Sequence, residues 1–347
     1  MANTPNPSYA LTPAILRLVA EIGELVGRQS VMAESALTPR LRRGNRLRTI
    51  QASLAIENNT LTLEQVTAVL DGKRVLGHPR EILEVKNAFA AYEGLVQWSP
   101  ASREDLLSAH GTLMAGLTDD AGRFRRGSVG IAQGERVVHV APPAERVPFL
   151  IDNLLRWLAR TDEHPLVASS VFHYEFEFIH PFSDGNGRIG RLWQTLVLCR
   201  WKPLLAYLPV ESVIRDRQDD YYRVLAHSDS KGDSTAFVEF LLAAILKALK
   251  EAVTSDQESD RESDQVEALL KVMAAEKSQS ATELMTALAL SHRPNFRKLY
   301  LHSALHAGLI EMTIPDKPNS RAQRYRLTAK GQAGRKRLMS AERRKEA

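Results

Sequence analysis

Apolar side chains return every three to four residues along most of the first 250 positions, which is the spacing that gathers them on one face of an α-helix. The segments with this pattern are 13–29, 46–58, 62–72, 81–96, 102–117, 147–160, 165–179, 187–199 and 236–250. The pattern therefore predicts a mainly α fold whose helices share a buried core.

One segment breaks the helical pattern. In "GSVGIAQGERVVHVAPP", residues 127–143, two β-prone pieces flank "AQGE" and two prolines follow. This order predicts a β-hairpin inside an otherwise helical domain. Because a solitary hairpin is marginally stable in water, we expect it to pack on helices or to act as a movable flap.

The chain changes character after residue 250. The stretch "TSDQESDRESD", residues 254–264, is acidic and serine-rich and contains no apolar side chain. It has nothing to bury, so it is typical of a linker or of an extended, solvated helical connection. We therefore predict an N-terminal helical region over 1–80, a helical core over 81–250 and an acidic linker over 251–264.

The C-terminal quarter predicts a second, smaller domain. "SATELMTALAL" and "SHRPNFRKLYLHSALHAGL" give a helix, a turn and a longer helix, and residues 310–328 look like two strands around a Pro- and Lys-containing loop. Helix, turn, helix and hairpin is the pattern of a winged helix. We assign this α+β module to 265–340, followed by a charged tail over 341–347.

Composition places the protein among soluble globular chains, since 44% of its 347 residues are hydrophobic and 25% are charged. No apolar run is long enough to span a bilayer, and the first residues lack the basic start and apolar core of a signal peptide. We expect a cytoplasmic protein with no membrane partner. Cys199 is the only cysteine, and its apolar neighbours predict a buried thiol.

The net charge of +5 hides an asymmetry. Residues 265–347 carry 16 Lys and Arg against 7 Asp and Glu, a net of +9, whereas residues 1–264 carry −4. The basic side chains fall on the predicted second helix and on the wing, at Arg293, Arg297, Lys298, Arg321, Arg324 and Arg326. They favour DNA as a partner of 265–340, although such modules also mediate dimerisation or bind proteins, which leaves a homodimer open.

The stretch "IHPFSDGNGRIGRLW", residues 179–193, concentrates the candidate chemistry. The preceding helix ends near His180 because a residue before proline is pushed out of helical geometry. The next helix begins near "GRIGR", so "SDGNG" is a tight turn that leads into a helix N-terminus. Unpaired N–H groups and the positive end of the helix dipole make that place a binding site for phosphate.

The polar side chains around this turn complete a reactive group. Arg188 and Arg191 share one helical face and can reach successive phosphates, and Asp184 is a carboxylate suited to Mg²⁺. His180 can accept a proton from an attacking hydroxyl. Each residue alone is more often structural, but together they indicate nucleotidyl or phosphoryl transfer.

The sequence "HPFSDGNGRIGR" resembles the signature of Fic-domain proteins, His-x-Phe-x-(Asp/Glu)-Gly-Asn-Gly-Arg-x-x-Arg, at every fixed position. The resemblance covers most of residues 1–250, since "GRFRRGSVGI", "HVAPPAERV" and "RQDDYYRVL" are similar to elements that flank the motif in that family. It implies a helical bundle with a hairpin flap, and an enzyme that transfers AMP from ATP to a Ser, Thr or Tyr hydroxyl of a protein.

The resemblance also implies roles for single residues. His180 is the general base, Phe182 anchors the loop, and Asp184 holds Mg²⁺ between the α and β phosphates of ATP. The remaining nucleotide contacts are expected from Gly185, Asn186, Gly187, Arg188, Ile189, Gly190, Arg191, Tyr221 and Tyr222. The two tyrosines would border the adenine, although adjacent tyrosines on a helix more often pack into a core. The flap would hold an extended segment of the target protein through Val137, Val138, His139 and Val140.

Upstream, "SLAIEN" fits the pattern Ser/Thr-x-x-x-Glu-Asn/Gly of an inhibitory helix in Fic proteins, here over about 47–58. Its pattern residues are Ser53, Glu57 and Asn58. We predict that Glu57 pairs with Arg191 and occupies the place of the γ-phosphate. The simpler reading is an exposed glutamate at a helix end. Two other functions stay open: removal of AMP from a modified target by the same site, and a DNA-binding regulator whose core senses nucleotide.

Overall fold

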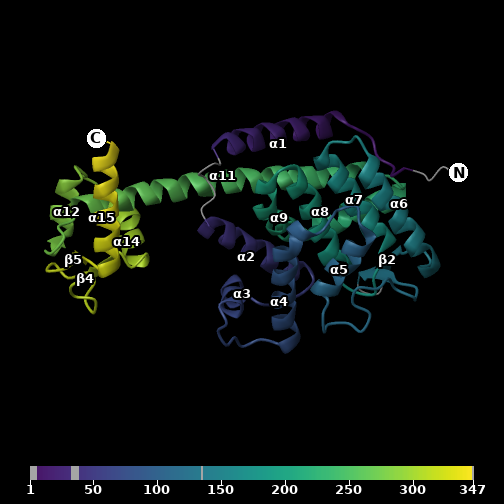
Figure 1. Cartoon of the computed structure of the whole chain (residues 1–347), viewed down its shortest axis with the longest axis horizontal. Coiled ribbons are helices and arrows are strands. Elements are labelled where there is room, and N and C mark those ends of the chain that lie inside the picture. The colour runs from purple at the N-terminus through teal and green to yellow at the C-terminus, as the bar shows by residue number, and fades with distance from the viewer. Residues whose placement is uncertain (1–5, 33–38, 134–135, 346–347) are drawn as a thin grey trace. The chain divides into compact units, whose positions relative to one another are not determined.

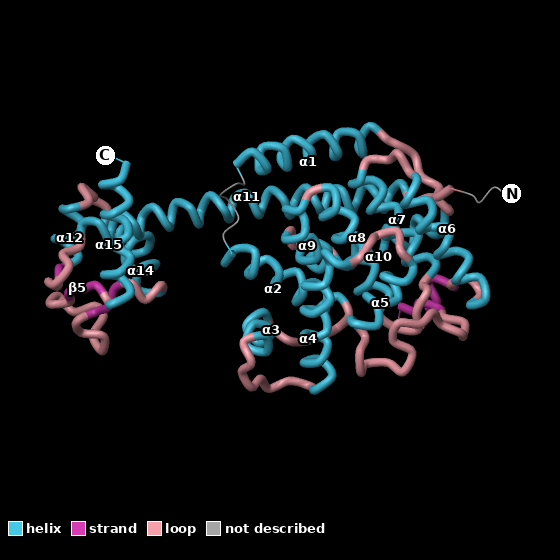
Figure 2. The backbone as a smooth tube through the Cα atoms, viewed as in Figure 1, coloured by secondary structure: helices cyan, strands magenta, loops and turns pink. Residues whose placement is uncertain are grey.

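The computed structural model describes the backbone of residues 6–32, 39–133 and 136–345, and the side chains of 6–28, 42–129, 141–254 and 264–340. The chain divides into two compact units, Met1–Ala252 and Val253–Ala347. Helices dominate and the strands are few and short (Figure 2), so the mainly α fold class is confirmed.

The first unit contains the helices that the apolar spacing predicts (Figure 1). They are α1 Pro13–Met32, α2 Pro39–Ile56, α3 Leu63–Leu70, α4 Pro79–Gly94, α5 Arg103–Leu113, α6 Val147–Arg160, α7 Pro165–Ile179, α8 Asn186–Trp201 and the first part of α11 Thr235–Val272. Helices α9 Val210–Asp216 and α10 Gln218–Lys231 were not among the periodic segments. Within the described ranges, no helix is both long and apolar enough to cross a membrane.

Local signals explain where several helices begin. The Thr62 side chain accepts a hydrogen bond from the Gln65 N–H and the Gln65 side chain reciprocates, a capping box that starts α3. Helices α4, α6 and α7 carry proline in their first turn, where the missing N–H costs nothing.

Helices α7 and α8 pack against each other and lie between two apolar clusters of the first unit. Phe172, Phe176 and Trp193 belong to the cluster shared with α2, α4, α5 and α6. Val171 and Leu198 belong to the cluster shared with α1, α9, α10 and α11. The α7–α8 pair is thus held from both sides. The Cys199 thiol is buried as predicted.

The predicted hairpin is present as strands β1 Gly130–Gln133 and β2 Arg136–Val140. The strands pair antiparallel, with Gly130 opposite Val140 and an irregular register between Ile131 and Ala132. Strand β2 also approaches α10. The side chains of the flap residues Val137, Val138, His139 and Val140 lie outside the described part of the structure.

The second unit has its own apolar core, which includes Leu284, Phe296, Leu301 and Tyr325. Its elements after α11 are α12 Ala281–Ala287, α13 Arg293–Phe296, a π-helical turn Arg297–Leu301, α14 His302–His306 and α15 Ala329–Lys345. Strands β3 Gln279–Ser280, β4 Ile310–Met312 and β5 Arg324–Leu327 form an antiparallel sheet in the order β3-β5-β4. Helix α11 runs through 251–264, and α15 was not predicted.

Candidate active site

His180 occupies the turn between α7 and α8 in a left-handed backbone conformation, with φ 48° and ψ 63°. Its N–H still donates to the Phe176 carbonyl at 2.9 Å, so it caps α7. The proline that follows prevents the helix from continuing. A left-handed conformation costs a non-glycine residue about 1–2 kcal/mol, so contacts with the rest of the protein must hold this turn.

One of these contacts comes from His110 on α5. The Phe182 ring is fully buried and stacks on the His110 ring with 3.6 Å between centroids. The Gly122 N–H donates to His110 Nδ1 at 2.9 Å, so His110 Nε2 carries the proton that it donates to the Asp184 carbonyl at 3.0 Å. Burial lowers the pKa of His110, which favours this neutral form. Motif reasoning identified Phe182 and missed His110.

The Asn186 side chain closes the loop. Its Oδ1 accepts from the Phe182 N–H and its Nδ2 donates to the Phe182 carbonyl, both at 2.9 Å, and the side chain is buried. What Asn186 offers a phosphate is therefore its backbone N–H, which has no intrahelical acceptor in the first turn of α8. Gly185, with φ 86°, precedes it where a Cβ would come within 2.7 Å of the Met114 sulfur.

Asp184 is half-exposed and lies beside two arginines. Its Oδ1 accepts from the Gly185 N–H at 2.6 Å and from Arg188 at 2.8 Å, and its Oδ2 accepts from Arg80 at 3.2 Å. Glu84 on α4 lies 3.5 Å from the Arg188 guanidinium and 3.6 Å from that of Arg80. One accessible carboxylate at this place fits a Mg²⁺ ion that takes its other ligands from phosphate and water.

Arg191 is buried and pairs with the predicted inhibitory residues. Its Nε donates to Ser53 Oγ at 3.0 Å, and Nη2 donates to the Ser53 carbonyl at 3.0 Å and to Glu57 Oε1 at 2.8 Å. Burial by itself lowers the pKa of Arg191, but the Glu57 carboxylate raises it above the ordinary value. The exposed Asn58, with φ 67°, follows the end of α2. The predicted contact between Glu57 and Arg191 is present.

The Glu57 carboxylate also lies directly at the first turn of α8. A Cβ added to Gly187 would collide with Glu57 Oε1 and would come within 3.0 Å of the Arg191 guanidinium. Gly190 is confined as well, since a Cβ there would lie 2.8 Å from Glu177 Oε1. Ile189 is fully buried, so its side chain belongs to the core. A carboxylate thus occupies the helix N-terminus where a phosphate would bind.

The two tyrosines predicted at the adenine differ in position. Tyr221 is buried, and its hydroxyl lies 3.1 Å from His173 Nε2. Tyr222 is 36% exposed and packs edge-on against Tyr221. Burial, and then the Glu57 carboxylate, raises the pKa of Tyr222. Of the pair, Tyr222 is therefore the one that a ligand near Glu57 can reach.

Arg125 connects the hairpin to this turn, and sequence reasoning did not single it out. Its guanidinium donates to the carbonyls of Gly127 at 2.8 Å, Pro142 at 2.5 Å, Ile179 at 3.3 Å and His180 at 2.7 Å. Its backbone N–H donates to the Pro181 carbonyl at 2.9 Å. The only sequence signal was its place in "GRFRRGS", just before the hairpin.

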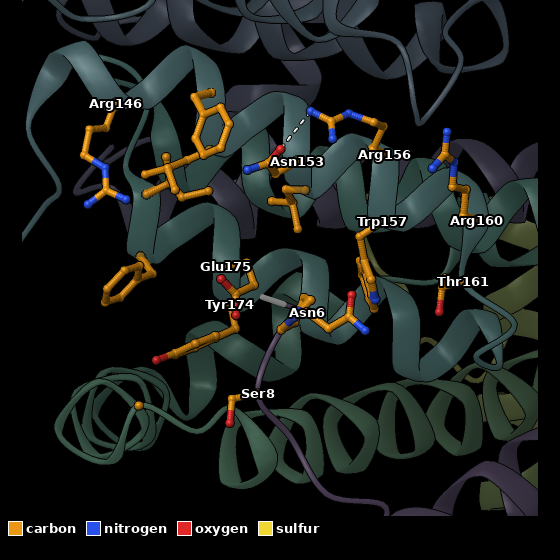
Figure 3. A pocket seen from close by; sticks show the side chains of 17 residues that line it. Asn6, Ser8, Arg146, Asn153, Arg156, Trp157, Arg160, Thr161, Tyr174 and Glu175 are labelled. Atoms are coloured by element: carbon orange, nitrogen blue, oxygen red, sulfur yellow. Dashed lines mark hydrogen bonds between the residues drawn. The ribbon is translucent and has the colours of Figure 1, made fainter. Parts of the chain in front are cut away.

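A cavity of about 740 Å³ lies elsewhere, between α6, α7 and residues 6–8 (Figure 3). Its lining includes Arg156, Tyr174 and Glu175, and it contains none of the residues from His180 to Arg191. Burial, with Asp229 nearby, raises the pKa of Glu175 to about 7. The cavity reaches Ile179, the residue before His180, but not the motif residues themselves.

The helical fold with its hairpin, and a loop that joins a histidine, a carboxylate and two arginines at a helix N-terminus, are features of a Fic-type domain. Residues 100–198 match the Fic/DOC family, and residues 264–328 match the family described as "Filamentation induced by cAMP protein Fic-like, C-terminal domain". A Fic family protein from Desulfovibrio desulfuricans, known from a crystal structure, shares 64% sequence identity with this chain. The match covers 94% of this chain and 99% of that one, with a TM-score of 0.74. This chain belongs to the Fic family.

Curated relatives carry the name "Protein adenylyltransferase Fic". The protein from Nematostella vectensis is 31% identical over 55% of this chain and 45% of its own length. That from Drosophila erecta is 32% identical over 55% of this chain and 39% of its own length. This chain thus spans less than half the length of these relatives.

Proposed function

We propose that this protein is an adenylyltransferase that moves AMP from ATP to a Ser, Thr or Tyr hydroxyl of a target protein or of itself. The observation that carries the proposal is the turn from His180 to Arg191, which joins a base, a carboxylate, a helix N-terminus and two arginines. Relatives named protein adenylyltransferase Fic support the same reaction.

In the proposed reaction, the hydroxyl oxygen attacks the α-phosphorus of ATP and its proton passes to His180. The bond from the α-phosphorus to the bridging oxygen breaks, and pyrophosphate leaves. The first-turn N–H groups of α8, with Arg188 and Arg191, hold the phosphates. Asp184 would hold Mg²⁺, which supplies positive charge to the α and β phosphates when bound.

We also propose that Glu57 inhibits this reaction. Its carboxylate occupies the helix N-terminus and pairs with Arg191, so ATP must displace it before the γ-phosphate can reach the same guanidinium. The hairpin supports docking of an extended segment of the target protein. β1 and β2 form a two-stranded sheet, so in that sheet each described strand pairs along one edge and its other edge can pair with a strand of the target.

The transfer reaction is tested by mass spectrometry after incubation with ATP and Mg²⁺. A gain of AMP on protein hydroxyls that is abolished by His180→Ala is the expected result. If AMP is instead lost from a modified protein and none is gained, the same site removes AMP and the transferase proposal is wrong.

The second unit carries a second candidate function, and we propose that it binds duplex DNA. Helix α12, a turn over 288–292 and the helical run Arg293–His306 are followed by β4 and β5. Phe296, Leu301 and Ala304 anchor the run in the core. A helix that follows a turn, is anchored in the core in this way and is followed in the chain by a hairpin is suited to enter the major groove of DNA.

Charge favours DNA as the partner of this surface. Residues 284–310 contain no Asp or Glu, whereas Arg293, Arg297 and Lys298 are exposed there. Among the described residues of this unit, no ion pair involves these three, while Arg324 pairs with Glu283 at 2.8 Å and Arg326 with Glu311 at 2.5 Å. The wing cations left for phosphate are therefore Lys317 and Arg321. Double-stranded RNA is a poorer fit, because its major groove is too narrow for a helix.

The test uses the full-length protein and the fluorescence anisotropy of a labelled mixed-sequence duplex at several salt concentrations. Removing two phosphate contacts with Arg297→Ala/Lys298→Ala should weaken binding about tenfold or more and flatten the log–log salt slope by about 2. The matched control is Arg156→Ala/Arg160→Ala, which removes equal charge from α6 and should bind as the wild type does. No binding at low salt, or equal weakening by both pairs, would contradict DNA recognition and favour a protein partner.

A further inference from the structure

We infer that Arg125 is a positioning residue that couples the target-docking hairpin to the catalytic base, an inference that rests on the proposed transferase function. One guanidinium bonds both ends of the hairpin segment and the turn that carries His180. No motif of the sequence assigns it a role.

On the hairpin side, Arg125 fixes the two places where the chain enters and leaves the flap. Gly127 precedes β1 and Pro142 follows β2, and both carbonyls accept from this guanidinium. If one end of the hairpin shifts, the Arg125 guanidinium shifts with it, and its hydrogen bond to the other end changes. The two ends of the hairpin segment can therefore move only by disturbing Arg125.

On the catalytic side, Arg125 satisfies three consecutive carbonyls. The guanidinium reaches Ile179 and His180, and the backbone N–H reaches Pro181. These residues form the left-handed turn at the end of α7, which holds its conformation only while the surrounding structure constrains it. The bond of 2.7 Å to the His180 carbonyl acts on the residue that would accept the proton.

The chemistry of this position requires arginine. The side chain is buried, and burial lowers its pKa, although Glu145 opposes that effect. A buried cation must be compensated, and here four carbonyl oxygens do so. Only the planar fork of guanidinium spans acceptors on two segments at once, whereas the ammonium of lysine is a point donor. A target segment that binds to the hairpin would thus affect the orientation of His180 through Arg125.

The experiment compares Arg125→Lys and Arg125→Ala in the Glu57→Gly background. The rate of transfer is measured as self-modification with ATP that is labelled on the α-phosphate, and the affinity for ATP is measured separately. The hydrogen bonds of Arg125 within the described residues go to the hairpin ends and to residues 179–181, and none goes to the first turn of α8 or to Arg191. We therefore expect transfer to fall at least about tenfold in both variants while the Kd for ATP changes less than about twofold. Added methylguanidinium should restore part of the activity of Arg125→Ala but not of Arg125→Lys.

The exposed Arg123→Ala is the matched control and should transfer at the background rate. Unchanged transfer in Arg125→Lys would overturn the inference, and so would parallel loss of transfer and ATP affinity in that variant, because either result leaves Arg125 with at most a structural role. No transfer by the Glu57→Gly parent would instead contradict the proposed function itself.

Discussion

Among single residues, the two motif arginines are held by carboxylates, and the proposed function makes these carboxylates compete with phosphate for the same donors. Arg191 is committed to Ser53 and Glu57, and Arg188 lies between Asp184 and Glu84. Both motif arginines thus already have anionic partners. In the proposed reaction, ATP exchanges these partners for phosphate oxygens, so the competing carboxylates would set the basal activity.

This competition predicts the effect of Glu57→Gly on the rate of self-modification. Loss of a charge-assisted pair worth about 1.5–3 kcal/mol should raise the rate about tenfold or more, because ATP no longer displaces Glu57. The rate is measured with labelled ATP. Glu64→Ala on α3 removes a nearby exposed glutamate and should change nothing. Equal rates for wild type and Glu57→Gly would exclude the inhibitory role.

The motif residues could be predicted, because their side-chain types and spacing are visible within one short stretch. The Glu57–Arg191 pair, 134 positions apart, could be predicted only through the resemblance to Fic-domain proteins. His110 and Arg125 could not, because their partners lie 74 and 55 positions away and depend on how α5 and the hairpin pack. The tyrosine pair shows the same limit. Spacing placed both on a helix, and only packing separates the buried Tyr221 from the partly exposed Tyr222.

At the scale of elements, the α7–α8 pair contains a buried polar contact as well as apolar packing. His173 on α7 lies 2.9 Å from Gln194 Oε1 on α8 and 3.1 Å from the Tyr221 hydroxyl on α10. Glu177 and Arg191 also face this group. Burial lowers the pKa of His173 to about 4, so the ring is neutral in the folded protein.

This predicts how stability depends on pH. A histidine whose pKa is lower in the folded than in the unfolded protein binds fewer protons when folded. Its contribution to the free energy of unfolding is therefore complete above pH 6.5 and is lost as the pH falls toward 4. Between pH 7 and 5 the loss should be about 2 kcal/mol in the free energy of unfolding. His173→Gln should reduce this dependence in urea titrations, and the exposed His227→Gln should not. Identical pH dependence in all three proteins would contradict the assignment.

Element boundaries were predictable where apolar periodicity and prolines agree, as for α6 and α7. Helix α9 was missed because seven residues are too few to show a period. The acidic stretch 254–264 allowed two readings, a linker or a solvated helical connection. The helical one is present, because α11 continues through the stretch and a helix that is already formed propagates more readily than a new one begins.

In the whole molecule, two units have separate cores, and we propose a different function for each. The first unit holds the turn from His180 to Arg191 together with Glu57, which we propose competes with ATP. The second unit presents exposed cations on the helical run Arg293–His306. The charge difference between the two parts of the chain was visible in the sequence, and the ion pairs that occupy Arg324 and Arg326 were not.

The proposed function rests on AMP transfer at the turn between α7 and α8. The most direct test incubates Glu57→Gly with Mg²⁺ and ATP that carries its label on either the α- or the γ-phosphate. We predict that protein acquires the α label, that it acquires no γ label, and that Glu57→Gly/His180→Ala acquires neither. Incorporation of the γ label, or of the α label without His180, would contradict AMP transfer by this turn.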